Sequence, residues 1–96
     1  MRLTNHEIKA IKDTFYEVFE DGDIYLFGSR VDDSKKGGDI DLYISPSKQL
    51  DNLHQKKIDF LVKLDFAIGE QKIDVIISKD KTRLIEKEAL RTGVKI

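Results

Sequence analysis

The chain has 96 residues, of which 40% are apolar and only one is proline. This length suits one domain with a thin core, because a domain this short buries only roughly 60–65% of its unfolded surface. The absence of cysteine excludes disulfides and thiolate metal sites. The balance of 17 basic and 18 acidic residues is not the charge pattern of a protein that holds a nucleic-acid backbone by itself.

The first residues lead directly into polar, helix-forming sequence, without the apolar core of a signal peptide. No apolar run approaches the roughly 20 residues that cross a bilayer, so we expect a cytoplasmic protein with no membrane partner. The segment 79–96 carries six basic and three acidic residues. A solvated helix face explains this excess, and a docking surface for an acidic partner or ligand is the alternative.

A helix is expected over residues 5–20, because Thr4 and Glu7 have the spacing of a capping box. Apolar residues follow at helical spacing: Ile8, Ile11, Phe15, Val18 and Phe19. The acidic and glycine residues at 21–23 end this helix. Residues 24–27 are apolar on both faces, which is typical of an inner strand that is covered on both sides.

About eleven residues separate this strand from the next, enough for a loop or a single helical turn. Residues 39–44 then alternate cleanly between two faces. One face is aliphatic, and the other carries Asp39, Asp41 and Tyr43. The alternation therefore predicts a strand with one buried face and one polar face.

Residues 45–47 close this strand and offer a cap for a second long helix. The buried face of that helix is marked by Leu50, Leu53, Phe60, Leu61 and Leu64. Residues 73–77 form a third strand, residues 82 or 83 to 91 a short helix, and residues 94–96 a possible last strand. The expected fold class is α+β, with a small mixed sheet of three or four strands and helices packed on one face.

The presence of Asp39 and Asp41 in a strand needs an explanation, because aspartate is among the residues least favoured in strands. Their spacing places the two Cα atoms roughly 6.6 Å apart on one face of the strand. Carboxylates at that distance can converge on one cation or on two neighbouring cations. Without a cation they repel, and one pKa should rise. A polar, solvated sheet face is the other explanation of this pair.

Asp74 lies between two aliphatic residues in the third strand and on the opposite side from them. If strands 39–44 and 72–78 are neighbours, Asp74 can lie about 5 Å from one member of the Asp39–Asp41 pair. Three carboxylates on one sheet face would suit a hard cation such as Mg²⁺ or Mn²⁺. Taken alone, Asp74 is better explained as a solvated strand residue.

Gly28 and Ser29 stand where the first strand ends and a helical turn could begin. Glycine lets a ligand approach the backbone, N–H groups at a helix start suit a phosphate, and Ser29 adds a hydroxyl donor. The dipeptide is equally typical of an ordinary turn. Beside a carboxylate-bound metal, however, anion donors form the other half of a triphosphate site.

These residues together resemble the signature of the DNA polymerase β-type nucleotidyltransferase superfamily. The likeness rests on Phe27-Gly28-Ser29-Arg30, the nine residues from Arg30 to Gly38, and then Asp39-Ile40-Asp41-Leu42. It extends to the third aspartate and to the closing Ala89-Leu90-Arg91-Thr92-Gly93-Val94. It is nearest to the minimal nucleotidyltransferases, many of which are paired with HEPN-domain proteins in toxin–antitoxin systems. The resemblance implies that residues 1–96 form one minimal nucleotidyltransferase domain.

The resemblance implies a role for each motif residue. Gly28 and Ser29 would hold the triphosphate, while Asp39 and Asp41 bind two Mg²⁺ ions. Asp74 would bind the catalytic metal and act as, or orient, the base that deprotonates an acceptor hydroxyl. The product would carry a nucleoside monophosphate, and pyrophosphate would leave. Gly38 departs from the family pattern, because serine is common at that position.

Three cations of the loop, Arg30, Lys35 and Lys36, are further candidates for phosphate contact. A solvated loop explains the two lysines better and Arg30 equally well. No residue that reads a base can be named, so ATP is expected from the family alone.

A chain of this length has little sequence left to hold base, ribose and acceptor, so we expect a second polypeptide in a hetero-oligomer. The resemblance points to a HEPN-type ribonuclease toxin that is silenced by AMPylation of a tyrosine. The main alternative is an antitoxin that acts by occlusion, without catalysis. An aminoglycoside-type enzyme is a further alternative, although such enzymes usually need added substrate-binding structure. A polymerase or tRNA-tailing role fits poorly with the neutral charge.

Overall fold

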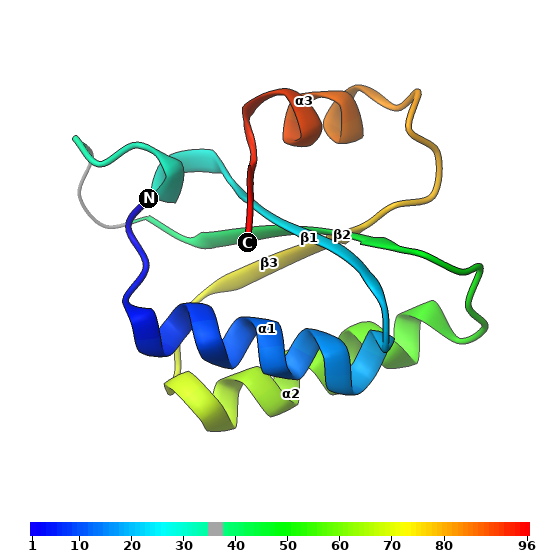
Figure 1. The fold of residues 1–96 in the computed structure, drawn as a ribbon, viewed down its shortest axis with the longest axis horizontal. Coiled ribbons are helices and arrows are strands. Elements are labelled where there is room, and N and C mark those ends of the chain that lie inside the picture. The colour runs from blue at the N-terminus through cyan, green and yellow to red at the C-terminus, as the bar shows by residue number, and fades with distance from the viewer. Residues whose placement is uncertain (35–37) are drawn as a thin grey trace.

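The computed structural model describes residues 1–34 and 38–96. Within these residues, three α-helices, one 3₁₀ turn and four strands follow one another (Figure 1). In order they are α1 (Asn5–Phe19), β1 (Gly22–Phe27), η1 (Gly28–Val31), β2 (Ile40–Pro46), α2 (Leu53–Ile68), β3 (Ile73–Ile77), α3 (Leu84–Thr92) and β4 (Val94–Lys95). The single helical turn that the sequence allowed after Gly28 is therefore present as η1.

The four strands form one mixed sheet in the order β3-β2-β1-β4. β1 pairs antiparallel with β2 and with β4, whereas β2 and β3 are parallel. Parallel neighbours need a crossover connection, and α2 supplies it. The predicted small mixed sheet is confirmed, with four strands rather than three.

Helices cover both faces of this sheet. α1 and α2 lie side by side on one face, as expected, whereas α3 lies over the opposite face (Figure 1). α3 covers this second face by packing on Tyr43. Tyr43 of β2 and Glu86 and Ala89 of α3 are all fully buried. The expectation of helices on one face thus holds for two of the three helices.

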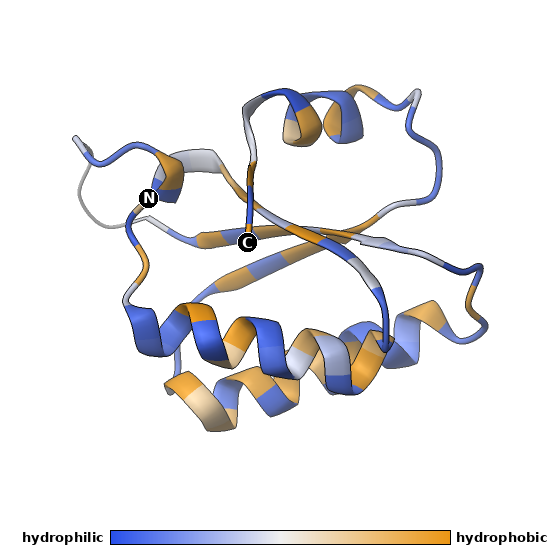
Figure 2. Cartoon of the chain, viewed as in Figure 1, coloured by the Kyte–Doolittle hydropathy of each residue, from blue (hydrophilic) through white to orange (hydrophobic). Residues whose placement is uncertain are grey.

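The hydrophobic core lies between the sheet and the pair α1–α2. Figure 2 shows apolar residues running along the strands and recurring on both helices. The fully buried members of this core are Ile11, Leu26, Ile40, Leu42, Ile44, Phe60 and Leu64, with Phe15 and Phe19 almost fully buried. The apolar alternation of β2 therefore points at the helices, which leaves Asp41 on the other face.

The helix starts differ in how well the sequence predicted them. The capping box of α1 is confirmed, because the Glu7 backbone N–H donates to Thr4 Oγ1 at 3.0 Å and the Thr4 N–H donates to Glu7 Oε1 at 2.9 Å. The cap expected at 45–47 for α2 is wrong. β2 continues through Pro46, and α2 begins after Asn52, which has a left-handed backbone and no side-chain cap bond.

None of the helices within residues 1–34 and 38–96 has both the length and the apolar character that a membrane span requires.

Candidate functional site

Asp41 and Asp74 lie directly opposite each other on neighbouring strands. The parallel pairing of β2 with β3 puts Ile40 beside Ile73, Asp41 beside Asp74 and Leu42 beside Val75. Backbones of paired strands are about 4.8 Å apart. The neighbouring strands that the argument for three carboxylates required are therefore confirmed.

Asp39 lies immediately before β2 and is held by Lys72, which precedes β3. Lys72 Nζ is 3.4 Å from Asp39 Oδ2, and the Ile40 backbone N–H donates to the Lys72 carbonyl at 3.0 Å. Both side chains of the ion pair remain in contact with solvent. The sequence analysis missed Lys72. Strand alternation places it on the same face as Asp74, and that signal could have identified it.

Burial raises the pKa of Asp41 above its ordinary value, and the charges of Asp74 and Asp39 raise it further. The Lys72 ammonium opposes this shift but does not cancel it. The repulsion that the sequence predicted for crowded carboxylates thus falls on Asp41. A cation bound nearby would stabilise the ionised form of Asp41 and so lower its pKa again.

Gly28 allows the start of η1 to approach this carboxylate. Phe27 is the β1 partner of Asp41, so Gly28 follows directly at the end of the same pair of strands. Its φ is +76°, and a Cβ added there would lie 2.3 Å from Asp41 Oδ2. No residue with a side chain could occupy this position without displacing Asp41. The structure therefore brings Gly28 beside Asp41, and Ser29 is the next residue of η1.

The donor set suits a hard cation in its chemistry, since carboxylate oxygens are what Mg²⁺ and Mn²⁺ prefer. The raised pKa of Asp41 and the space left by the missing Cβ of Gly28 agree with that. Even so, in the part of the chain that the structure describes, no three His, Asp or Glu side chains converge on a point that could hold a metal ion. Asp41 and Asp74 nevertheless lie side by side on β2 and β3, and Asp39 immediately precedes β2.

A family model described as "Polymerase beta, Nucleotidyltransferase" matches residues 9–96. The chain belongs to this nucleotidyltransferase family. A search of curated proteins found no match to the chain. The matched range contains every motif residue discussed above, so the superfamily that the sequence resembled is confirmed, and with it a nucleotidyl transfer function.

A second glycine, Gly38, lies against Ser29 of the nucleotidyltransferase. Gly38 has a φ of +90°, and a Cβ added there would lie 2.2 Å from Ser29 Oγ. The residue that departs from the family pattern therefore lies against the hydroxyl that was expected to hold phosphate. Serine at this position would need both a rare backbone conformation and a shift of Ser29.

Arg30 is tied to the backbone on both sides of the loop. Its Nη1 donates to the Arg2 carbonyl at 2.9 Å, and its Nε donates to the Gly38 carbonyl at 3.3 Å. Arg2 in turn donates from Nη2 to the Ser29 carbonyl at 2.9 Å. A guanidinium has five N–H donors, so Arg30 keeps others with which to contact a ligand. Lys35 and Lys36 lie outside the described residues.

An open cleft of about 550 Å³ extends from the carboxylates of the nucleotidyltransferase along β3. It is lined by side chains from the sheet and from both flanking helices: Phe27, Asp41, Lys57, Leu61, Ile73, Asp74, Val75, Ile76 and Ile85. Apolar walls with a few polar groups are typical of a ligand site. Sequence reasoning missed Lys57 and Ile85 as lining residues because the packing of α2 and α3 brings them there.

Proposed function

We propose that this nucleotidyltransferase transfers AMP from ATP to a tyrosine hydroxyl of a HEPN-type toxin partner, and that it thereby acts as a cytoplasmic antitoxin. The observation that carries the proposal is the direct pairing of Asp41 with Asp74 beside the start of η1. Two acidic side chains and a glycine turn, brought together where β1 ends and β2 and β3 begin, are the parts that phosphoryl-group chemistry needs in one place. The partner and the nucleotide are supported by the family resemblance.

Asp39, Asp41 and Asp74 are the residues that would hold Mg²⁺, with Mn²⁺ as a substitute. When bound, such ions would neutralise phosphate charge and polarise the α-phosphate. Lys72 must then release Asp39 or share it, because its ammonium lies 3.4 Å from one of the Asp39 oxygens. The salt bridge thus occupies in the free protein a carboxylate that the ligand would use.

The remaining steps fall to side chains and backbone of the chain. Gly28 and Ser29 would hold the triphosphate through backbone N–H groups and the Ser29 hydroxyl, and the free donors of Arg30 would add charge. Asp74 would accept the proton of the acceptor hydroxyl. The oxygen of that hydroxyl forms a bond to the α-phosphorus, the bond from this phosphorus to the bridging oxygen breaks, and pyrophosphate leaves. Positioning supplies much of the rate enhancement.

The open side of the cleft supports a protein acceptor. Its walls come from the sheet, α2 and α3, and the exposed β3 edge leaves it open to solvent. A partner that covers this side would complete the wall and present the tyrosine. This arrangement would also make activity on a small molecule slow in the absence of the partner.

An antitoxin that only occludes its partner is the second candidate, and one observation favours it. Within residues 1–34 and 38–96 the carboxylates do not converge as a ready metal site. In that case the retained aspartates would contribute to partner binding rather than to transfer.

Transfer of label from [α-³²P]ATP with Mg²⁺ to the product of the adjacent gene separates the two candidates. Wild type should label that protein, and Asp41→Asn should not. A stable complex that never becomes labelled would support occlusion instead. Mass spectrometry of the labelled protein should find AMP on tyrosine, and AMP on another residue would refute the tyrosine acceptor.

A further inference from the structure

Among the residues that the structure describes, no strand pairs with the outer side of β3, which is an edge strand. The Ile40 N–H donates to the Lys72 carbonyl and the Ser78 N–H donates to the Ile44 carbonyl, so the even-numbered residues direct their backbone groups toward β2. Successive residues of a strand point these groups to opposite sides. Ile73, Val75 and Ile77 therefore direct N–H and carbonyl groups outward, where another strand could pair with them.

The two edges of the sheet are very different. β4, at the opposite edge, has two residues, and Lys95 there forms an ion pair of 2.9 Å with Asp23. A short edge strand with a lysine is a common way to prevent pairing with another chain. β3 has five residues, four of which are aliphatic, and its one charge, Asp74, points to a sheet face rather than along the edge. Only the β3 edge is thus suited to strand pairing.

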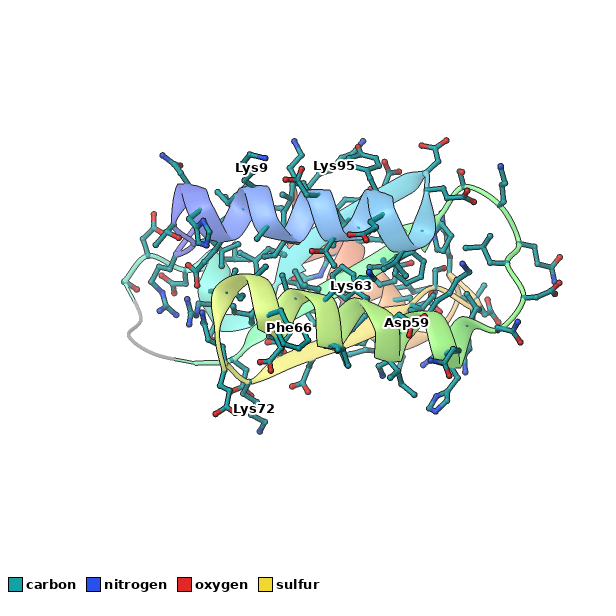
Figure 3. All side chains as sticks on the ribbon, turned by 90° about the horizontal axis from the view of Figure 1, so that it is seen from below. Lys9, Asp59, Lys63, Phe66, Lys72 and Lys95 are labelled. Atoms are coloured by element: carbon teal, nitrogen blue, oxygen red, sulfur yellow. The ribbon has the colours of Figure 1, made fainter. Side chains whose placement is uncertain are left out.

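α2 runs along this edge and adds apolar surface to it. One flank of α2 faces α1, where Lys63 Nζ lies 2.8 Å from Glu17 Oε1, and the other flank borders β3 (Figure 3). Leu61 and Val62 line a groove with Ile73 at one end of the strand. Ile58 and Val62 are 40% and 50% exposed. An outward-facing strand and a half-exposed helix flank therefore form one continuous surface, which we name the β3 edge surface.

The charges on the β3 edge surface are separated along its length. At the start of β3 lie Asp41, Asp74 and, on α2, Asp65, together with Lys72, which is paired with Asp39. The groove at the other end is lined by the cations of Lys57, Lys79 and Arg83, by His54 and by no acidic side chain, and Lys57 also lines the cleft of Asp41 and Asp74. Arg83 also forms an ion pair with the buried Glu86, in which Nη1 lies 3.4 Å from Oε2. One end of the surface is thus mainly acidic and the other is basic.

This separation favours one particular occupant, a second copy of the same chain. A two-fold axis that pairs β3 with β3 antiparallel places the acidic end of each copy against the basic end of the other. The charges match at both ends at once, and the half-exposed flanks of α2 meet across the axis. Parallel pairing of two copies would instead set like charges against each other.

We propose that two copies of this chain associate through antiparallel pairing of their β3 strands, so that the two four-stranded sheets join into one of eight strands. The pairing also brings the basic end of each copy beside the carboxylate cleft of the other, where cations would help to hold an anionic ligand. Because the toxin partner of the proposed function would cover the same β3 edge, pairing of two copies is proposed for the free chain, where a toxin partner would have to displace it. The tests below use the isolated chain, so they can fail or succeed separately from the proposed function.

Sedimentation equilibrium of the isolated chain over a concentration series tests the proposal. We expect a species of twice the 11.1 kDa chain mass for wild type. Val62→Arg should shift it to monomer with an unchanged circular dichroism spectrum. Tyr16→Arg is the matched control, because Tyr16 is 51% exposed on α1, away from the β3 edge surface, and this variant should stay dimeric. A wild-type monomer throughout the series would overturn the proposal, as would a Val62→Arg dimer as stable as wild type.

Charge reversal tests the antiparallel arrangement separately. Lys57 lies toward the basic end and Asp65 toward the acidic end of the β3 edge surface. Lys57→Asp and Asp65→Lys should each weaken self-association, and an equimolar mixture of the two variants should restore it, because the mixed dimer regains opposite charges at both ends. A mixture that associates no better than the separate variants would exclude this arrangement.

Discussion

The hydroxyl of Tyr43 donates a hydrogen bond of 2.9 Å to Glu86 Oε1, and neither side chain is exposed to solvent. The same carboxylate accepts from the Ser78 hydroxyl at 2.6 Å and from the backbone N–H groups of Lys79 and Asp80. A buried carboxylate is stable only when its lone pairs are satisfied in this way. Through these hydrogen bonds, Glu86 holds α3 on the sheet face that also carries Asp41 and Asp74.

Glu86 should make stability fall at acidic pH. Burial alone would raise its pKa, but the hydrogen bonds from Ser78, Asp80, Lys79 and Tyr43 outweigh burial and lower the pKa from 4.5 to about 2. A carboxylate with a lowered folded pKa stabilises the fold above its unfolded pKa, and this contribution is lost as pH falls from about 4.5 toward 2. Urea unfolding of Glu86→Gln should show a lower free energy of unfolding at neutral pH, by about 2 kcal/mol, and a flatter dependence across this window. An unchanged slope would contradict the assignment.

Asp41→Asn should stabilise the free protein. Burial and then the charges of Asp74 and Asp39 raise the pKa of Asp41, so its ionised form costs stability at neutral pH. The stabilising contribution of its protonated form is present below the unfolded pKa and is lost as pH rises through the folded pKa. Thermal unfolding without added metal should show the melting temperature of Asp41→Asn a few degrees above that of wild type at pH 7. A lower melting temperature would show that Asp41 is not crowded.

Gly28→Ala should disturb the site beyond its effect on the backbone. Alanine at a positive φ costs roughly 1–2 kcal/mol, and here its Cβ would also lie 2.3 Å from Asp41 Oδ2. Gly69→Ala is the matched control, because Gly69 has a φ of +83° but an added Cβ there meets no atom within 4 Å. Urea unfolding should show a larger loss of stability for Gly28→Ala than for Gly69→Ala. Equal losses would mean that Asp41 can move away freely.

Lys72 is the cation that limits repulsion among the carboxylates, so Lys72→Gln should raise the pKa of Asp41 further. The side-chain carboxyl resonance of Asp41, followed by NMR over a pH series, measures this directly. Lys95→Gln removes a lysine that is paired with Asp23 on the far edge of the sheet, and it should leave the Asp41 titration where it is. A lower Asp41 pKa in Lys72→Gln would contradict the geometry.

Local patterns in the sequence were enough to predict part of this structure. The capping box at Thr4 depends on contacts within one helical turn, and the alternation of Asp39 and Asp41 depends on one strand, so both are visible in the residues themselves. The start of α2 is not visible in this way, because Asn52 takes a left-handed conformation and makes no side-chain cap bond that a sequence pattern would reveal. Charged residues in helices are usually exposed, so the burial of Glu86 could not be inferred. Its donors come from β2, from the segment after β3, and from Arg83, the residue before α3.

The part of the site that lies within one strand, Asp39 and Asp41, could be predicted from the sequence. Asp41 and Asp74 come together only through the parallel register of β2 and β3, which the sequence does not specify. The same register brings Lys72 to Asp39, and for that reason Lys72 was missed although it stands two residues before Asp74. The position of α3 over the other face was missed because it depends on Tyr43, which hydrogen-bonds within the fold rather than facing solvent.

Isothermal titration calorimetry of ATP, with and without Mg²⁺, tests most directly whether the paired carboxylates of Asp41 and Asp74 form a metal–nucleotide site. We predict that wild type binds ATP only when Mg²⁺ is present, and that Asp41→Asn loses this binding. Asp59→Asn should bind as wild type does, because Asp59 is an exposed residue of α2 that accepts a hydrogen bond from Gln55. ATP binding that does not require Mg²⁺, or that survives in Asp41→Asn, would contradict the account.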